Sequence, residues 1–208
     1  RFFSGQEQQQ HGAESWEDLI INIACTYGPD LLDRKIDDFD LEAIRQRVSL
    51  GDIKVAAIQR SRGYSHRKSL VIDKIAEAIA VVKSVAPHTI IMVDNCYGEF
   101  VEKQEPCDVG ADVAVGSLIK NPGGGLAPTG GYIVGKEHYI DLIGRRLTAP
   151  SIGNEVGSYA YGWRLFYQGL FMAPHTVNQA IKGSFLIGKC MELLGYENRP
   201  ADGIYKIG

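Results

Sequence analysis

Two side chains with the chemistry of a cofactor site lie near the ends of two apolar runs. Asp94 lies in HTIIMVDN (88–95), and Lys120 closes ADVAVGSLIK (111–120), 120 − 94 = 26 residues later. Ligands of open α/β sheets bind beyond the carboxyl ends of the strands, so both side chains are expected to face one crevice. A lysine there is a candidate nucleophilic amine, and an aspartate is a candidate partner for a protonated ring nitrogen.

This pair of groups is what pyridoxal 5'-phosphate requires. The cofactor takes a lysine amine for a Schiff base and a carboxylate that keeps its pyridine nitrogen protonated, so that the ring accepts electrons from a substrate. Ser117, three residues before Lys120, supplies a hydroxyl for a phosphate oxygen. We interpret the glycines between 121 and 131 as allowing the backbone to pass close to the cofactor.

Further candidate residues follow two of the apolar runs. Arg60, Arg62 and Tyr64 stand at the end of the run 53–61, where they either contact a phosphate or a substrate carboxylate or are ordinary surface groups. Tyr97 and Glu99 either shape the crevice or only turn the loop after Asp94. The histidines at 66, 88, 138 and 175 share no spacing and are expected to be structural or exposed. No carboxylate cluster indicates a metal site.

The order of elements along the chain predicts an α/β fold. Strands are expected over 53–61, 88–95, 111–120 and 131–135, and helices over 38–48, 69–85, 136–147 and 162–196. Asp40 is a plausible N-cap of the first helix, and Pro174 is expected to break or kink the last. Near-continuous Val and Ile runs favour a mainly parallel sheet with helices on both sides.

The ends of the chain differ from this regular middle. Residues 1–35 show no clean strand and no glycine-rich cradle, so they are predicted to be a poorly defined amino-terminal segment. Residues 36–170 are predicted to form part of a large cofactor-binding domain. Residues 171–208 are predicted to form a long helix and the start of a small carboxy-terminal domain.

Composition limits the classes of partner. The net charge is −3 and the pI is about 6.0, with no basic stripe, which argues against nucleic acid or an anionic membrane surface. No apolar run is long enough for a membrane span, and no secretory signal opens the chain, so a cytoplasmic protein is expected. The four cysteines form no CxxC pair and are interpreted as free thiols.

Several motifs resemble one family. VDNCYGEFVE (93–102), GSLIKNPGGGLAPTGGYIVG (116–135), IQRSRGYS (58–65) and RLTAPSIGNEVG (146–157) are similar to the bacterial aluminium-resistance proteins, relatives of methionine γ-lyase and cystathionine γ-lyase. The resemblance runs from about Ile53 to the end. It implies the fold type I, aminotransferase-like architecture of pyridoxal-phosphate enzymes, and the chain looks truncated relative to this family.

The resemblance also implies roles and a reaction. Lys120 would be the Schiff-base lysine, Asp94 the partner of the pyridine nitrogen and Ser117 a phosphate contact. The reaction would be a carbon–sulfur lyase type of β or γ elimination on an amino acid. The crevice of such lyases lies at a subunit interface, so a homodimer or homotetramer is expected, and the aromatic residues between 159 and 171 fit a buried interface.

Two alternatives come from other classes. Residues 117–120, SLIK, match the S-x-x-K signature of penicillin-binding enzymes, although the SDN and KTG elements of that site do not occur. The other alternative is a noncatalytic homologue that keeps the sheet and serves as an assembly subunit. The lack of a recognisable phosphate cradle in residues 1–35 favours it.

Overall fold

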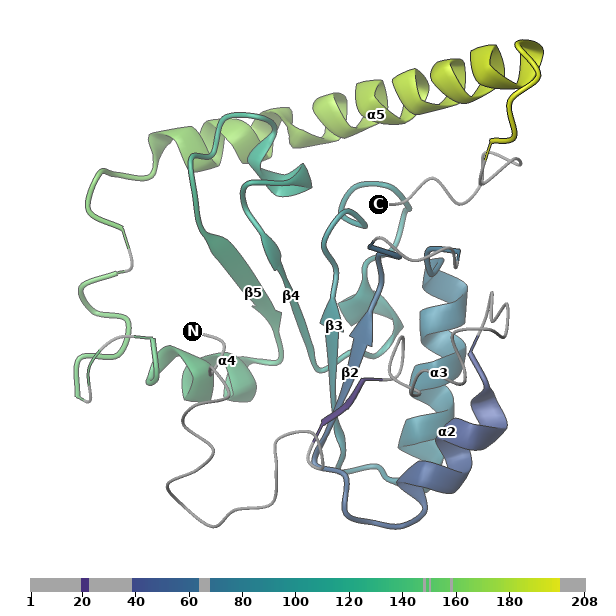
Figure 1. Ribbon diagram of the computed structural model, residues 1–208. Helices are drawn as coiled ribbons and strands as arrows, with labels where there is room; N and C mark the ends of the chain where they lie inside the picture. Colours follow the sequence, from purple (N-terminus) through teal and green to yellow (C-terminus); the bar gives the residue numbers. More distant parts are fainter. Residues whose placement is uncertain are drawn as a thin grey trace, which may run out of the picture.

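A five-stranded, mainly parallel sheet organises the chain. The computed structural model describes residues 20–22, 39–63, 68–147, 149, 151–157 and 159–198 (Figure 1). The strands lie in chain order: β1 (Ile20–Asn22), β2 (Val55–Gln59), β3 (Ile90–Asp94), β4 (Val113–Ser117) and β5 (Gly131–Gly135). The first four are parallel, and β5 runs antiparallel to β4. The predicted α/β class with a mainly parallel sheet is confirmed.

The register places the ends of β3 and β4 at one edge. Asp94 is paired with Val115, so Ser117 lies two residues further along the neighbouring strand. The backbone N–H of Asn95 donates to the Val115 carbonyl at 2.8 Å, which extends this pairing beyond the end of β3. Side chains that follow Asp94 and Ser117 therefore emerge at the same carboxyl edge.

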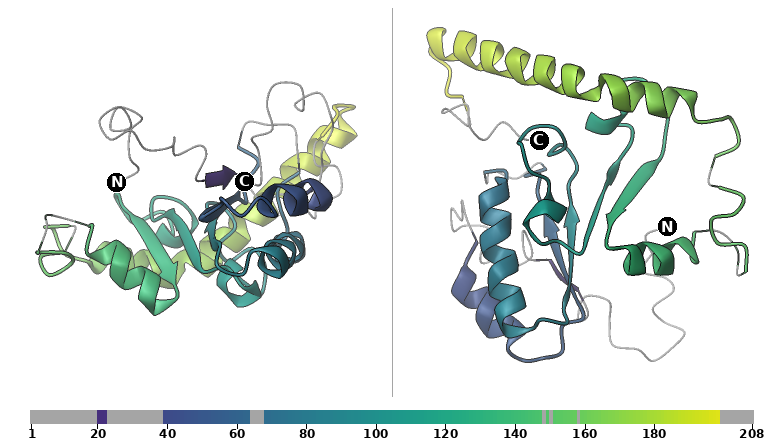
Figure 2. Two further views of the ribbon diagram at one scale, coloured as in Figure 1. Left: turned by 90° about the horizontal axis from the view of Figure 1, so that it is seen from below. Right: turned by 180° about the vertical axis from the view of Figure 1, so that it is seen from behind.

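Helices α2 (Leu41–Val48) and α3 (Ile72–Val85) pack side by side on one face of the sheet (Figures 1 and 2). The Asp40 side chain accepts a hydrogen bond from Ala43 N, as expected of an N-cap. The core between helices and sheet is aliphatic, with Ile58, Ile75 and Ile91 at 1% exposure or less.

The two faces of the sheet are not equally covered. In β2 and β3 buried residues alternate with half-buried ones, whereas the apolar runs predicted cover on both sides. The buried residues are those of the core that faces α2 and α3. Among the described residues, the other face of these two strands is therefore the less protected one.

Asp112, at the start of β4, links three parts of the fold. Its carboxylate accepts hydrogen bonds from Ile91 N (2.7 Å), Lys83 Nζ (2.7 Å) and Lys136 Nζ (2.5 Å). Burial raises the pKa of this carboxyl, but the two lysines and the Ile91 amide outweigh burial and hold the pKa below its usual value. Asp112 thus ties α3 and β3 to the segment that follows β5.

Strand β1 is the main departure from the expected order of elements. The sequence indicated no clean strand within residues 1–35, yet Ile20–Asn22 pair with Val55–Ala57. The prediction was wrong because three residues are too few for a periodic pattern, and the partner strand provides the order that local sequence does not.

Two helices follow β5. Helix α4 spans Glu137–Gly144, and helix α5 spans Arg164–Leu193, 30 residues that cross the carboxyl edge of the parallel strands (Figure 1). Pro174 lies inside α5 and does not end it, because a proline removes only one backbone donor and the bonds on either side remain. Within the described ranges, no helix combines the length and the apolar character needed to cross a membrane.

Candidate active site

Lys120 and Asp94 lie at the ends of adjacent strands, as the sequence predicted. Lys120 follows β4 by three residues, and its backbone N–H donates to the Ser117 carbonyl at 3.3 Å. Asp94 ends β3, and its Oδ1 accepts from the backbone N–H of Cys96 at 3.0 Å. The Ser117 hydroxyl oxygen accepts from Ile119 N at 3.3 Å. Three of the predicted site residues thus share one edge of the sheet.

The Lys120 amine faces the loop that follows β3. Its Nζ lies 4.4 Å from the centroid of the Tyr97 ring. Burial lowers the pKa of Lys120, but a hydrogen bond to Cys96 and electrostatic interactions with Cys96, Tyr97 and Asp94 outweigh burial and raise the pKa overall. The lysine of this structure is therefore an ammonium at neutral pH.

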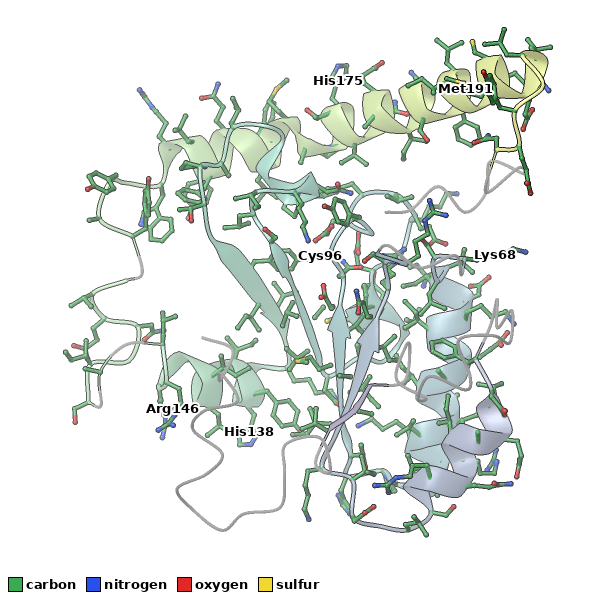
Figure 3. All side chains as sticks on the ribbon, viewed as in Figure 1. Lys68, Cys96, His138, Arg146, His175 and Met191 are labelled. Atoms are coloured by element: carbon green, nitrogen blue, oxygen red, sulfur yellow. The ribbon has the colours of Figure 1, made fainter. Side chains whose placement is uncertain are left out.

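Cys96 lies between Asp94 and Lys120 in this arrangement, and Figure 3 shows it at the ends of the central strands. Burial raises the pKa of its thiol, and the hydrogen bond and charge of Asp94 act in the same direction, while Lys120 opposes them. The thiol is thus kept protonated. Cys96, Cys107 and Cys190 are free, as expected, and Cys25 lies outside the described residues.

Tyr97 holds an unusual backbone conformation. Its φ of +67° is in the left-handed region, which a bulky aromatic residue rarely occupies. Such a conformation costs about 1–3 kcal/mol and persists only where the surroundings fix it. Tyr97 is also 42% exposed, although Gly98 and Glu99 beside it are buried. The loop therefore holds the Tyr97 side chain partly exposed at an energetic cost.

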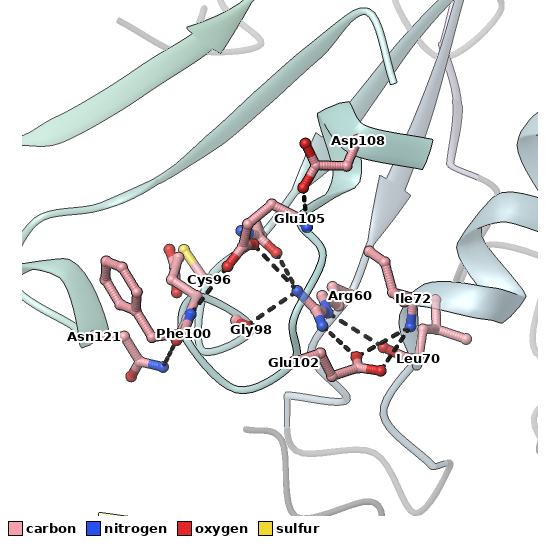
Figure 4. Close-up of polar contacts among 12 residues, drawn as sticks. Arg60, Leu70, Ile72, Cys96, Gly98, Phe100, Glu102, Glu105, Asp108 and Asn121 are labelled. Atoms are coloured by element: carbon pink, nitrogen blue, oxygen red, sulfur yellow. Dashed lines mark hydrogen bonds and ion pairs between the residues drawn. The ribbon is translucent and has the colours of Figure 1, made fainter. Parts of the chain in front are cut away.

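Arg60 fixes this loop from beneath (Figure 4). Its side chain is fully buried and follows strand β2. One terminal nitrogen donates to Asn95 Oδ1 at 2.7 Å and to the Gly98 carbonyl at 3.1 Å. The other donates to Glu102 Oε2 at 2.5 Å, and Nε donates to the Leu70 carbonyl at 3.3 Å.

The two acidic partners of Arg60 extend the clamp. Glu102 also accepts from Ile72 N, at the first residue of α3. Glu105 lies 3.6 Å from the guanidinium and accepts from Asn95 Nδ2 at 2.8 Å and from Phe100 N at 3.0 Å. The end of β2, the start of α3 and the loop after Asp94 are therefore joined through one guanidinium.

These contacts bear on the three residues predicted to meet a phosphate or a substrate carboxylate. Most of the donors of Arg60 are taken up by protein acceptors, which makes it a support for the loop in this structure. Arg62 is half-buried two residues further on, and Tyr64 lies outside the described residues. A contact of Arg60, Arg62 or Tyr64 with a ligand stays a prediction.

The buried Glu99 carboxyl and the half-buried Tyr132 phenol form a second link, between the loop after β3 and strand β5. The Tyr132 hydroxyl donates to Glu99 Oε1 at 2.7 Å, and the Glu99 backbone carbonyl accepts from Asn121 Nδ2 at 3.0 Å. Burial raises the pKa of Glu99 and, together with Glu99, that of Tyr132. Glu99 therefore does more than turn the loop, because it holds both β5 and the residue after Lys120. The sequence carried no signal for the role of Tyr132.

Glycines bring the turn at residues 118–124, which contains Lys120 and is called the lysine turn, into contact with helix α5. A Cβ on Gly124, which has a φ of +55°, would overlap the carbonyl of Gly169 in α5, and a Cβ on Gly169 would overlap the carbonyl of Gly123. The short 3-10 helix η4 (Asn121–Gly123) lies at this contact. The partner that approaches these glycines in the structure is thus a helix backbone, and their proximity to a cofactor remains a prediction.

The described histidines belong to no cluster of metal-ligating residues. His88, His138 and His175 are exposed, as the sequence predicted, with His138 on α4 and His175 on α5 in Figure 3. His66 lies outside the described residues. In the part of the chain that the structure describes, no group of three or more His, Cys, Asp or Glu residues could hold a metal ion.

Comparison with known proteins finds a family model and several solved structures that are similar to this chain. The model of the methionine gamma-lyase family matches residues 8–206. The carbon-sulfur lyase involved in aluminium resistance from Clostridium novyi NT is 38% identical, with a TM-score of 0.78 over 88% of this chain and 50% of that chain. A protein of Clostridium acetobutylicum, provisionally named a cystathionine beta-lyase involved in aluminium resistance, is 40% identical with a TM-score of 0.79 over the same shares.

A curated protein is also similar to this chain by sequence. The uncharacterized protein YnbB of Bacillus subtilis is 52% identical over 147 residues, which are 71% of this chain and 35% of YnbB. The chain spans about half the length of the solved structures and about a third of YnbB. The family match begins at residue 8, well before Ile53, where the motifs alone had placed the start of the resemblance.

The fold and the solved relatives define the class of protein: an α/β protein with the fold type I architecture of pyridoxal-phosphate enzymes. Within that class the chain belongs to the methionine gamma-lyase family. The resemblance to aluminium-resistance proteins is confirmed by the names of its solved relatives.

Proposed function

We propose that this protein is a pyridoxal-phosphate-dependent enzyme that cleaves a carbon–sulfur bond of an amino acid by β or γ elimination. The observation that carries the proposal is the placement of Asp94 and Lys120 at the ends of adjacent parallel strands. An amine that can form a Schiff base and a carboxylate that can accept a hydrogen bond from the pyridine nitrogen are the two groups that the cofactor needs at this edge. Asp94 and Lys120 therefore fit pyridoxal phosphate.

Each residue has a distinct role in this proposal. Lys120 would bind the cofactor through its amine, and the same amine would move a proton at the substrate α-carbon. Asp94 keeps the pyridine nitrogen protonated, and Ser117 binds the phosphate. The bound cofactor supplies an electron sink for the α-carbanion. Family membership supports these roles.

Chemical trapping tests the proposal. The protein is mixed with pyridoxal 5'-phosphate, reduced with borohydride, digested and mapped by mass spectrometry. We expect one stoichiometric pyridoxyl label, on Lys120, together with a visible absorption band that disappears on reduction. A label spread over surface lysines, or none, would contradict the proposal and favour the noncatalytic assembly subunit.

We also propose that the protein acts as a homodimer or homotetramer. Tyr161, Tyr167 and Phe171 are 72% exposed or more, whereas Tyr159, Trp163 and Phe166 pack on one another near the start of α5. Exposed aromatic rings at this density are typical of surfaces that bury on association.

Sedimentation velocity at low micromolar concentration is the direct measurement of assembly. We expect a dimer or tetramer, and Phe171→Ser with Tyr167→Ser should shift it toward the monomer. A monomer that carries one cofactor per chain would refute the proposed assembly.

A further inference from the structure

We propose that Tyr97 is a positioning residue that holds the amine of Lys120 over its ring whenever that amine is not bonded to carbon. The role of Tyr97 in catalysis rests on the proposed function, whereas the contact between Tyr97 and Lys120 is independent of it. Lys120 Nζ lies 4.4 Å from the ring centroid, within the range of a cation–π interaction. Tyr97 lies on the loop after Asp94, in a different part of the chain from the lysine it contacts.

The backbone around Tyr97 is fixed on both sides. On one side, Cys96 N donates to the Asp94 carboxylate at 3.0 Å. On the other, Gly98 N donates to the Asn95 carbonyl at 2.8 Å, and the Gly98 carbonyl accepts from Arg60 at 3.1 Å. These contacts hold the left-handed φ of Tyr97, and that conformation points the ring toward the lysine. A strained residue kept in place by a buried clamp indicates a function for its side chain.

The charges around Lys120 explain what the ring adds. The groups that act on the amine electrostatically are Asp94, Cys96 and Tyr97. Asp94 is committed to the Cys96 amide and, in the proposed function, to the cofactor, and the Cys96 thiol stays protonated. The Tyr97 ring face, 4.4 Å from the amine, adds a contact that stabilises an ammonium when the lysine is released. It would keep the amine near the reacting atoms and would raise the pH at which the amine loses its proton.

A fluorinated series at position 97 tests this in the protein without cofactor. Fluorine withdraws charge from the ring face while the shape and the backbone preference change little. Wild type, Tyr97→Phe and Tyr97→trifluorophenylalanine are labelled with a trace amine reagent across a pH series. Labelling of Lys120 is read by peptide mapping, with Lys189, a distant and largely exposed lysine, as the internal reference.

The expected result is a graded shift. Tyr97→Phe should keep the midpoint of Lys120 labelling near that of wild type, because its ring face remains. The trifluoro variant should lower the midpoint by about half a pH unit, the scale of one partly exposed cation–π contact. The Lys189 midpoint should stay constant. Equal midpoints in the Phe and trifluoro variants would overturn the proposal.

A second substitution covers the case in which the fluorinated protein is not obtained. Tyr97→Leu keeps an apolar side chain but removes the ring, so it should lower the Lys120 midpoint, and a midpoint equal to that of Tyr97→Phe would refute the ring's role. Failure of the proposed function is separately visible, because it would appear as absent pyridoxyl labelling of wild type. The labelling midpoints depend on no cofactor.

Discussion

Replacement of Lys120 by alanine should abolish covalent attachment of pyridoxal phosphate and lower carbon–sulfur cleavage by about a thousandfold or more. The lysine is placed by the turn after β4, where its neighbour Asn121 bonds to the Glu99 carbonyl. Borohydride labelling and release of a thiol or sulfide from amino-acid substrates measure the two losses.

Lys120→Arg separates charge from nucleophilicity. Arginine keeps a cation over the Tyr97 ring but does not form a stable Schiff base, so this variant should be as inactive as Lys120→Ala while it retains the fold. Lys103→Ala is the control. Lys103 is exposed on the loop that follows β3, so this variant should have the labelling and activity of wild type. Retained activity in Lys120→Arg would remove the covalent role from this residue.

Arg60→Ala should lower the free energy of unfolding by about 3 kcal/mol, the low end of the cost of breaking a buried ion pair. The low end applies because Glu102 and Glu105 are 27% and 38% exposed, so water partly replaces the lost cation. The Asn95 side chain and the Gly98 carbonyl lose a donor as well. Urea denaturation followed by circular dichroism gives the difference.

The surface pair of Arg45 and Glu42 provides the matched control for Arg60. Its atoms lie 3.9 Å apart at 48% and 69% exposure, so Arg45→Ala should change the free energy of unfolding by about 0.5 kcal/mol or less. If Arg60→Ala is as mild as Arg45→Ala, the loop after Asp94 is held by other contacts. Arg60 would then be a better candidate for the ligand contact that the sequence suggested.

The strands and helices of the middle of the chain were predictable because their signals are local. The apolar runs that became β2, β3 and β4 have buried-strand length, and the Asp40 cap precedes an amphipathic helix. Strand β1 was missed because three residues depend on a partner far along the chain. The uneven cover of the sheet was missed for a related reason, since composition does not say which elements will pack on which face.

The candidate site also has a part that could be predicted from the sequence and a part that could not. The sequence predicted that Asp94 and Lys120 lie at one edge, because residues at the strand ends of a parallel sheet meet there. The contacts that support them were not predicted, because the Arg60–Glu102 and Tyr132–Glu99 pairs join residues that are far apart in the sequence. The sequence does not distinguish an arginine that binds a ligand at a strand end from one that is fully buried there. Only the geometry distinguishes the two.

The glycine contact between the lysine turn and α5 has a mechanical consequence. Gly123 and Gly124 meet Gly169 backbone to backbone, so no side chain between them can change rotamer to absorb a displacement. Helix α5 is 30 residues long, and its far end extends well beyond this contact (Figure 2). A small tilt of the distant end of α5 would therefore displace the turn that carries Lys120, because no side chain at the contact can absorb the movement.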